Sequence, residues 1–282
     1  MPYAVSVTSL MPPGEHIIRA NVEFPKGNKL PEKVFKAIIE NPLWGKTPPD
    51  EDAEAFKAAY AGAKVAVFQE GFPVEALKIA KYDGTADNFI QGINPIADRS
   101  PDQHNFGGDP ELGIGHYGPE RRMLMRFDLA ALPKLAKVKK ALLKLQLQRG
   151  EALEPVAYPV LVPWQEGSHD IYTKQGRGKG DVTWSARAFP DTRWGLPGCG
   201  QPGVDRAAQG VPAVSREIKT PRDKAEKAWM CWDLTEPAAG WIAEPAKNHG
   251  VLLVNRGYGH GAFRSSEYED PLFRPKLIVV WE

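Results

Sequence analysis

Cysteine is nearly absent from this chain of 282 residues, which contains only Cys199 and Cys231. Two cysteines cannot supply a disulfide framework or a thiolate metal site, since each of these needs more sulfur atoms. A single bridge between them and two unpaired thiols remain as alternatives. The fold must therefore rest mainly on a hydrophobic core, which a chain of this length can bury.

A net charge and long apolar runs are also lacking. The 36 lysines and arginines balance 35 aspartates and glutamates, so no overall field attracts nucleic acid or an anionic membrane. No apolar run approaches the ~20 residues that a membrane span needs, and the first residues lack the basic start and apolar stretch of a secretory signal. We therefore expect no nucleic-acid partner and no membrane span.

Linear catalytic motifs are missing as well. The six histidines include no His-Glu-x-x-His pair, and there is no Gly-x-Ser-x-Gly elbow, phosphate loop or dinucleotide fingerprint. We expect a protein that is not an enzyme and holds no organic cofactor. A polysaccharide lyase stays a minor alternative, because it could use tyrosine, histidine and arginine without a linear motif.

Glycine and proline are abundant, at 27 and 26 residues, and lie between short apolar runs. This spacing is typical of an all-β chain with many turns. Leucine occupies every second position from 143 to 147 and a polar residue follows each one, as in a strand with one buried and one wet face. The pattern predicts an antiparallel β-sandwich. The clearest strands are expected at 64–68, 76–82, 123–127, 138–148, 156–162, 251–255 and 276–281.

The first 75 residues have a different pattern and predict a small α/β extension packed on the sandwich. Strand-like runs occupy 4–8 and 16–24. A first helix is expected over 31–40, where apolar residues are spaced at i, i+1, i+4 and i+5 before an Asn-Pro stop. A second is expected from Asp50, where acidic residues favour a helix N-terminus, to Gly62.

Several phrases in the remainder of the chain follow one another in a characteristic order. Arg126-Phe127-Asp128-Leu129 closes an apolar strand, and Trp164-Gln165-Glu166-Gly167 is separated from Val182-Thr183-Trp184 by an insertion. The other phrases are Ala86 to Ile90, Asn105-Phe106-Gly107, Leu112 to Gly115, Trp232 to Thr235, Asn248 to Leu253, Phe263 to Glu267 and Arg274 to Leu277.

In this order the phrases resemble DNRLRE-type domains, the β-sandwich modules of secreted carbohydrate-active enzymes, archaeal disaggregatase-related proteins and bacterial surface proteins. The resemblance implies a jelly-roll-like sandwich over 76–282 without catalytic machinery. It also implies a secreted, periplasmic or cell-surface location. Long loops without periodicity are expected at 167–180 and 190–224, and loops of this length are usually functional or disordered.

Ligand contacts are expected on these loops and on exposed aromatic rings. Trp44 and Trp194 fall in polar, proline-rich segments and are candidate stacking platforms. In the inserted loop, Tyr172, Lys174 and Arg177 combine a ring with cations, which suits an acidic polysaccharide because arginine can clamp a carboxylate. A solvated loop without a ligand is the alternative. Five further tryptophans are expected in the core: Trp164, Trp184, Trp232, Trp241 and Trp281.

Two groups of oxygen-bearing side chains are candidate calcium ligands, because calcium takes six to eight oxygen ligands. One group lies in a loop and the other in a turn, and neither has EF-hand spacing. Surface carboxylates that bind nothing are the alternative. The candidates are Asp98, Asp102, Asn105 and Asp109 in the loop, and Glu267 and Asp270 in the turn.

Two functions remain open at this point. One is a non-catalytic extracellular module that binds polysaccharide, with structural calcium. The other is a structural or assembly subunit that binds partner protein subunits or further copies of itself. The N-terminal extension favours the second, since a carbohydrate-binding module alone would not need it.

Overall fold

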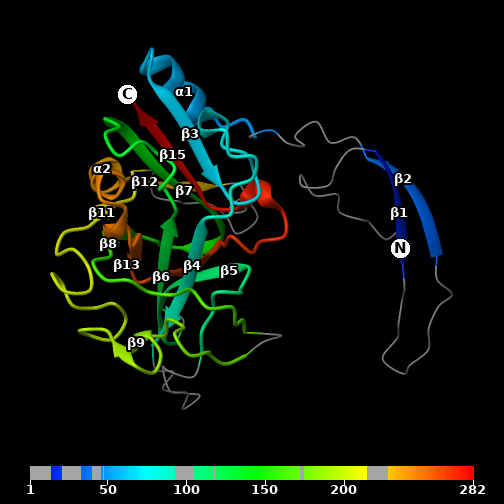
Figure 1. Cartoon of the computed structure of the whole chain (residues 1–282). Coiled ribbons are helices and arrows are strands. Elements are labelled where there is room, and N and C mark those ends of the chain that lie inside the picture. Colours follow the sequence, from blue (N-terminus) through cyan, green and yellow to red (C-terminus); the bar gives the residue numbers. More distant parts are fainter. Residues whose placement is uncertain are drawn as a thin grey trace.

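The computed structural model describes residues 14–20, 33–39, 46, 48–92, 104–116, 118–171, 175–214 and 228–282, the first two ranges as backbone only. The chain is mainly β and its strands pair antiparallel (Figure 1), which confirms the predicted fold class at this level. The jelly-roll order stays a prediction. The predicted strand at 4–8 lies outside the described residues.

The large sheet contains eleven strands in the order β11-β8-β13-β6-β5-β14-β7-β15-β3, with β12 paired to β7 and β4 paired to β6. Two smaller sheets pair β1 with β2 and β9 with β10. The strands of the large sheet are β3 (Lys64–Gln69), β4 (Thr85–Gln91), β5 (Glu111–His116), β6 (Glu120–Phe127), β7 (Val138–Glu151), β8 (Pro155–Pro159), β11 (Val211–Pro212), β12 (Trp229–Asp233), β13 (Val251–Asn255), β14 (His260–Arg264) and β15 (Lys276–Trp281).

Strand β7 joins the two halves of this curled sheet. Its first part pairs with β15 on one edge and β12 on the other, and from Leu147 onward it pairs with β14. Leucines from its first part and Phe68 of β3 then share a core with Met123 and Met125 of β6 and Phe263 of β14. The two halves therefore contribute to one hydrophobic core, whose burial is the main source of stability.

The outer faces of both halves are covered as well. Segments after β8 cover one of them, where Trp164, Trp194 and Cys199 pack on Ile90 and Leu124. On the other, Ala53 of helix α1 (Glu51–Ala59) packs with residues of β3, β7 and β15. Helix α1 was predicted correctly, and Asp50 caps it by accepting hydrogen bonds from Asp52 N and Ala53 N.

The cover by α1 overturns the prediction of a wet face on β7. The leucines at 143, 145 and 147 are buried, but Lys144 and Gln146 between them are buried too. Lys144 forms ion pairs with Asp50 and Asp52, and Gln146 accepts a hydrogen bond from Arg264 Nε at 2.5 Å. Polar residues on this face therefore meet partners from distant segments instead of water.

Two predictions of local structure are wrong. The expected helix at 31–40 is strand β2 (Lys33–Ile39), which pairs with β1 (Gly14–Ala20). β-Branched residues favour this pairing over an apolar spacing that fits one helix face. The expected strand at 76–82 contains a 3₁₀ turn, η1 (Glu75–Leu77), followed by Lys78 at a left-handed φ of 55°, which ends any extended run.

Other differences concern elements that the sequence patterns did not reveal. Helix α2 (Thr235–Ala243) follows β12 and precedes the turn η3 (Pro245–Lys247).

β3 is part of the large sheet, so the predicted boundary at 75 falls inside this unit. Both cysteines are free thiols. The remaining elements are β9 (Ala186–Ala188), β10 (Thr192–Arg193) and η4 (Pro271–Phe273).

Candidate functional site

Three carboxylates from distant parts of the sequence meet beside β4. Asp87 belongs to β4, Glu166 follows β8, and Glu267 lies in the turn after β14. Each offers one oxygen, and these three oxygens lie within 4.8 Å of one another. We call these residues the acidic cluster. Among the described residues, no other three histidine, cysteine, aspartate or glutamate side chains meet in this way.

The backbone of Glu166 is held firmly at this place. Asn88 Nδ2 and Asn105 Nδ2 each donate a hydrogen bond of 2.6 Å to Glu166 O. Glycine is required on both sides of this contact: a Cβ on Gly107 would lie 2.5 Å from Glu166 O, and one on Gly167 would lie 2.3 Å from Asn105 Oδ1. Two phrases that carry the family resemblance, Asn-Phe-Gly and Trp-Gln-Glu-Gly, thus fit together closely.

Asp87 is the innermost member of the acidic cluster. Its side chain is 1% exposed, its backbone N donates to Glu166 Oε1 at 2.5 Å, and its Oδ2 accepts from Ser266 N at 2.8 Å. Its Oδ1 is buried and has no hydrogen-bond partner. A buried carboxylate oxygen normally has a partner, because its desolvation is costly.

The third member, Glu267, lies at the solvent side of the acidic cluster. The residue is exposed, and its Oε1 accepts a hydrogen bond from Ser266 Oγ at 2.9 Å. Its backbone N donates to Ser265 Oγ at 3.1 Å. The two serines fix the turn, and Glu267 is the most exposed of the three carboxylates.

The three carboxylates of the acidic cluster repel one another, and none of them forms an ion pair among the described residues. Burial raises the pKa of Asp87 well above its ordinary value, and the charges of Glu267 and Glu166 raise it further. Burial raises the pKa of Glu166 to about 8, although a hydrogen bond from Asp87 N lowers it. Burial also raises the pKa of Glu267. Such a group of carboxylates can retain protons or bind a cation.

Two arginines lie close enough to act on these charges without pairing with them. The charge of Arg126 lowers the pKa of Glu166, and the charge of Arg274 lowers that of Glu267. Arg274 Nε donates to Tyr268 O at 2.7 Å, and Arg126 lies over the Trp164 ring at 5.5 Å. Among the described residues, no ion pair joins either arginine to the acidic cluster.

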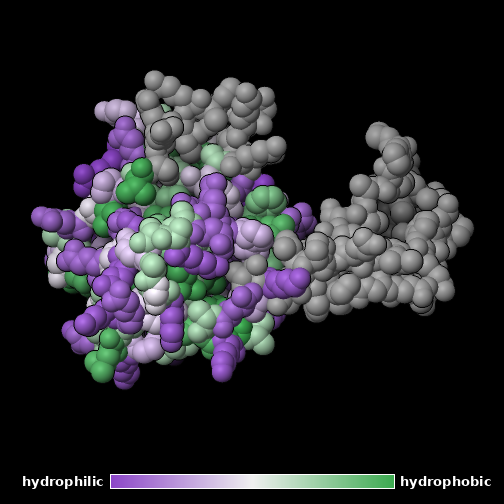
Figure 2. Space-filling view, turned by 90° about the horizontal axis from the view of Figure 1, so that it is seen from above, coloured by the Kyte–Doolittle hydropathy of each residue, from purple (hydrophilic) through white to green (hydrophobic). Residues whose placement is uncertain are grey.

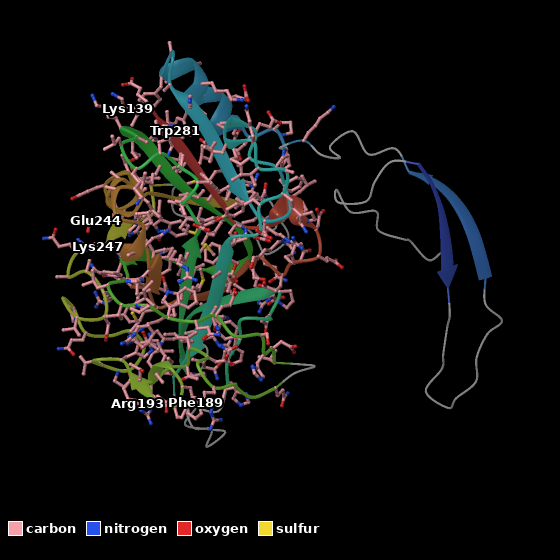
Figure 3. All side chains as sticks on the ribbon, viewed as in Figure 1. Lys139, Phe189, Arg193, Glu244, Lys247 and Trp281 are labelled. Carbon is pink, nitrogen blue, oxygen red and sulfur yellow. The ribbon has the colours of Figure 1, made fainter. Side chains whose placement is uncertain are left out.

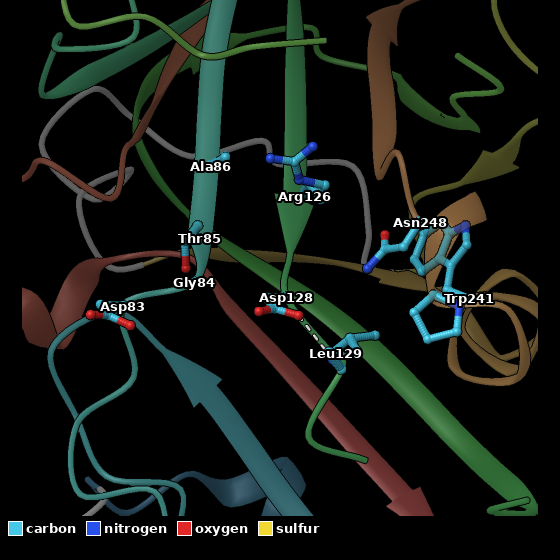
Figure 4. A pocket seen from close by; sticks show the side chains of 11 residues that line it. Asp83, Gly84, Thr85, Ala86, Arg126, Asp128, Leu129, Trp241 and Asn248 are labelled. Atoms are coloured by element: carbon cyan, nitrogen blue, oxygen red, sulfur yellow. Dashed lines mark hydrogen bonds between the residues drawn. The ribbon is translucent and has the colours of Figure 1, made fainter. Parts of the chain in front are cut away.

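A cavity of about 400 Å³ opens next to the acidic cluster, between β4, β6 and the α2 region. Figure 4 shows Asp83 and Thr85 on one side, Trp241 and Asn248 on the other, and Arg126 and Asp128 between them. We call it the polar pocket. Asp83 and Asp128 are exposed and Arg126 is half-buried, so charged groups are available to a ligand.

The wall of the polar pocket is held by hydrogen bonds within the protein. Asn248 Nδ2 donates to Phe127 O at 2.7 Å, and Asn248 Oδ1 accepts from Gly250 N at 3.3 Å. Asp128 Oδ1 accepts from Ala130 N at 2.9 Å, a bond that is drawn as a dashed line in Figure 4. Trp241 is 8% exposed and therefore offers only an edge of its indole.

The predicted ligand-binding residues are not brought together in the described part of the chain. Trp194 is 5% exposed and its Nε1 donates to Thr183 O, so the prediction of an exposed platform is wrong: the loop containing Trp194 packs on the outer face of the sheet. Arg177 lies over the Phe189 ring at 4.3 Å. Figure 3 shows Phe189 at the opposite end of the molecule from Trp281. Trp44, Tyr172 and Lys174 lie outside the described residues.

The tryptophans expected in the core are buried, with one partial exception. Trp184 packs only partly buried against the residues of the outer face. The exposed fractions of the others are between 0% and 8%. The four buried ones are Trp164, Trp232, Trp241 and Trp281.

Of the predicted calcium ligands, only Glu267 belongs to the acidic cluster. Asn105 Oδ1 accepts hydrogen bonds from Gly107 N and His169 N. This oxygen therefore stabilises the loop within the protein. Asp109 is buried but lies outside the acidic cluster, and Asp270 Oδ1 caps η4 by accepting from Leu272 N. Asp98 and Asp102 lie outside the described residues.

Asp87 and Glu166 were missed as candidate ligands. The available signal was a carboxylate in a predicted strand that also contains Ala86, Phe89 and Ile90, because a charged residue at such a position is rarely buried without a partner. For Glu166 the sequence offered no comparable signal, since its neighbours are polar.

Comparison with models of known protein families gave no match. Comparison with curated proteins gave no similar sequence. The resemblance to DNRLRE-type domains therefore stays a prediction. Within the described part of the chain, no helix is long and apolar enough to cross a membrane.

Proposed function

We propose that the chain is a non-catalytic module that binds polysaccharide, with one sugar unit in the polar pocket. The observation that carries this proposal is an open cavity of about 400 Å³ that combines charged side chains with the edge of an indole. Ligand sites are typically cavities of roughly this size with a few convergent polar groups. The extracellular or cell-surface location implied by the family resemblance belongs to the same proposal.

The chemistry of the polar pocket suits a polyhydroxylated ligand. The carboxylates of Asp83 and Asp128 can accept hydrogen bonds from hydroxyl groups, and the guanidinium of Arg126 can donate to ring or hydroxyl oxygens. The edge of Trp241 supplies a small apolar contact for a sugar C–H face.

The charge of the polar pocket favours a neutral sugar or an amino sugar over a uronate. Two carboxylates outnumber one guanidinium, so an anionic sugar would meet net repulsion. An acidic polysaccharide would have to use the loop at 167–180 instead. The two binding modes therefore predict different effects of substitutions.

The test is a glycan array with neutral, amino, uronate and sulfated glycans, followed by calorimetry on the best ligand. We expect Asp83→Asn/Asp128→Asn to weaken binding at least about tenfold, since hydrogen bonds from the ligand to charged acceptors are lost (about 1.4 kcal/mol). Asparagine at 128 can still accept from Ala130 N, so the pocket wall is kept. Glu236→Gln on exposed α2 surface serves as the control.

Two results would sink this proposal. One is the absence of binding to every glycan class, with and without calcium. The other is wild-type affinity in the double variant together with a loss of binding in Arg177→Gln, which would move the site to the loop at 167–180.

A second function, assembly with partner protein subunits or further copies of the chain, is favoured by one observation. Leu196 and Val204 are 52% and 47% exposed on a loop whose backbone is fixed by Asp205, which accepts from Gly195 N, Leu196 N and Gln201 N. Leu161, 45% exposed, donates its N–H to Asp205 O. Exposed apolar residues on a rigid loop suit protein contacts.

Assembly can be tested by light scattering of the purified chain. If the loop with exposed Leu196 and Val204 is an interface, the wild-type protein should be an oligomer or part of a complex. The double variant Leu196→Ser/Val204→Ser should then be a monomer. The face shown in Figure 2 mixes hydrophobic and hydrophilic residues in small groups. A monomeric wild type that also brings down no partner would argue against assembly.

A further inference from the structure

We propose that the acidic cluster is a binding site for a hard divalent cation, and that this cation is calcium. This inference does not rest on polysaccharide binding. It concerns Asp87, Glu166 and Glu267, which lie beside the polar pocket and do not line it.

The first support is the spacing of the three carboxylates. Calcium binds oxygen at roughly 2.3–2.6 Å, so two oxygens on one ion are at most about 5 Å apart. The oxygens of the acidic cluster lie within 4.8 Å of one another. A single ion can therefore contact all three carboxylates without a rearrangement of the backbone.

The second support is an oxygen without a partner. Asp87 is 1% exposed, and its Oδ1 makes no hydrogen bond, although its Oδ2 accepts from Ser266 N. An unpaired, buried carboxylate oxygen is costly for the fold unless a proton or a cation satisfies it. A cation in the acidic cluster would satisfy it together with the two glutamates.

The third support is the charge balance around the acidic cluster. Arg274 donates to Tyr268 O, and no ion pair among the described residues links it to the three carboxylates. Three carboxylates therefore lie within 4.8 Å of one another without an ion-paired cation among the described residues. A divalent cation would supply most of the missing positive charge.

The fourth support is preorganisation of the ligands. Asn88 and Asn105 hold Glu166 through its carbonyl oxygen, and Ser266 holds Asp87 through a backbone hydrogen bond. Ligands fixed in this way lose little freedom on binding an ion. The ion would join β4, the segment after β8 and the turn after β14.

The ligand chemistry selects calcium among common divalent cations. All three side chains offer oxygen, whereas zinc prefers nitrogen and sulfur ligands. Magnesium keeps several waters and usually binds one or two carboxylates, while calcium accepts six to eight oxygens in flexible geometry. Exposed Glu267 leaves one side open for water molecules to complete the shell.

The test uses the full chain after dialysis against EDTA, with calorimetric titration of CaCl₂, MgCl₂ and ZnCl₂ up to about 10 mM, since extracellular calcium sites bind at about 0.1–1 mM. We expect one calcium ion per chain. At a hundredfold excess over Kd, calcium should raise the Tm by about 5–10 °C.

Two variants and one control make the assignment specific. Glu267→Gln changes an exposed side chain and should weaken calcium binding at least tenfold without loss of folding. Asp87→Asn should raise the Tm in EDTA, because repulsion is removed, and should abolish the Tm response to calcium. Asp270→Asn serves as the control in the same turn, since asparagine can still cap η4, and should bind calcium like wild type.

Several results would overturn the proposal. They are the absence of calcium binding up to 10 mM with the same Tm in calcium and EDTA, a preference for zinc over calcium, and a loss of affinity in Asp270→Asn equal to that in Glu267→Gln. Unchanged calcium binding in both Glu267→Gln and Asp87→Asn would equally place the ion elsewhere.

Discussion

Two groups of charged residues lie at the same curled sheet and differ in how their charges are matched. In the first, the Asp50 carboxylate accepts from Lys144 Nζ at 2.9 Å and from Lys276 Nζ at 3.2 Å, with side chains 4% to 7% exposed. We call these residues the ion network. In the acidic cluster, three carboxylates meet with no paired cation among the described residues.

The pKa values follow this difference. Burial alone would raise the pKa of Asp50, but hydrogen bonds and charges of the two lysines outweigh it and lower the pKa. Burial likewise opposes the charge of Lys144, yet its carboxylate partners raise its pKa. Lys276, with Asp50 as its hydrogen-bond partner and Lys144 as a neighbouring charge, has a lowered pKa, mainly from burial. In the acidic cluster all three pKa values are raised.

The comparison indicates that charged side chains have two different roles in this molecule. The ion network is matched within the protein and anchors α1 to β7 and β15, so it serves the fold. The acidic cluster opposes folding until something outside the chain neutralises it, so it is the better candidate for function. Removing the charge of a matched carboxylate should therefore lower the free energy of unfolding. Removing the charge of an unmatched carboxylate should raise it.

The largest effect is expected for Asp50→Asn in the ion network. Asparagine still caps α1, but Lys276 loses its hydrogen-bonded counter-ion and Lys144 loses one of two, which should lower the free energy of unfolding by about 3–5 kcal/mol. Urea unfolding at pH 7 measures the loss. The control is Glu54→Gln, because its pair with Lys57 is exposed and should contribute less than about 0.5 kcal/mol. A similar small change in both variants would contradict a structural role of the ion network.

The next effect concerns the backbone that positions Glu166. Gly167 has a φ of +81°, and a Cβ there would lie 2.3 Å from Asn105 Oδ1. Gly167→Ala should therefore lower the free energy of unfolding by about 2–4 kcal/mol, through backbone strain and the displacement of Asn105.

Gly62→Ala separates the two causes in this second prediction. Gly62 has a φ of +87°, and a Cβ added there would meet no atom within 4 Å, so its substitution should cost only the strain of about 1 kcal/mol. Equal losses at both positions, measured by urea unfolding, would show that the contact with Asn105 does not matter.

Much of the fold was predictable where a local pattern decides the structure. The acidic start at Asp50 indicated α1, and the apolar runs at 251–255 and 276–281 coincide with β13 and β15. The outer cover of the sheet was not predictable, because it depends on segments far away in the sequence. Lys144 looked like a solvent-facing residue and Trp194 like an exposed ring, yet both are buried.

The candidate site was predictable only in part for the same reason. Glu267 was identified from a polar turn, but its partners Asp87 and Glu166 lie on other elements, and no spacing along the chain links the three. Asp87 was missed, although it is a charged residue in a strand that is mostly buried. The fold brings Glu166, which lies 79 residues later in the sequence, to the backbone N–H of Asp87. Only this contact shows that Asp87 belongs to a cluster.

The smallest effect, and the one of opposite sign, is expected for Asp109→Asn. Asp109 is buried outside both groups, its Oδ1 accepts from Glu111 N and its Oδ2 has no hydrogen-bond partner. Burial raises its pKa to about 6, so folding favours the protonated carboxyl. Its contribution to stability is therefore full below about pH 4 and is lost as the pH rises through about 6.

Asp109→Asn should remove this loss, because the amide stays neutral at every pH. We expect the variant to exceed wild type by about 1–3 kcal/mol at pH 7.5 and to match it near pH 4, in urea unfolding at a series of pH values. Asp128→Asn, at an exposed carboxylate, is the control for the loss of one aspartate and is measured at the same pH values. A variant less stable than wild type at pH 7.5 would mean that Asp109, like Asp50, has a matching partner. The acidic cluster would then be the one group of unmatched carboxylates in this comparison.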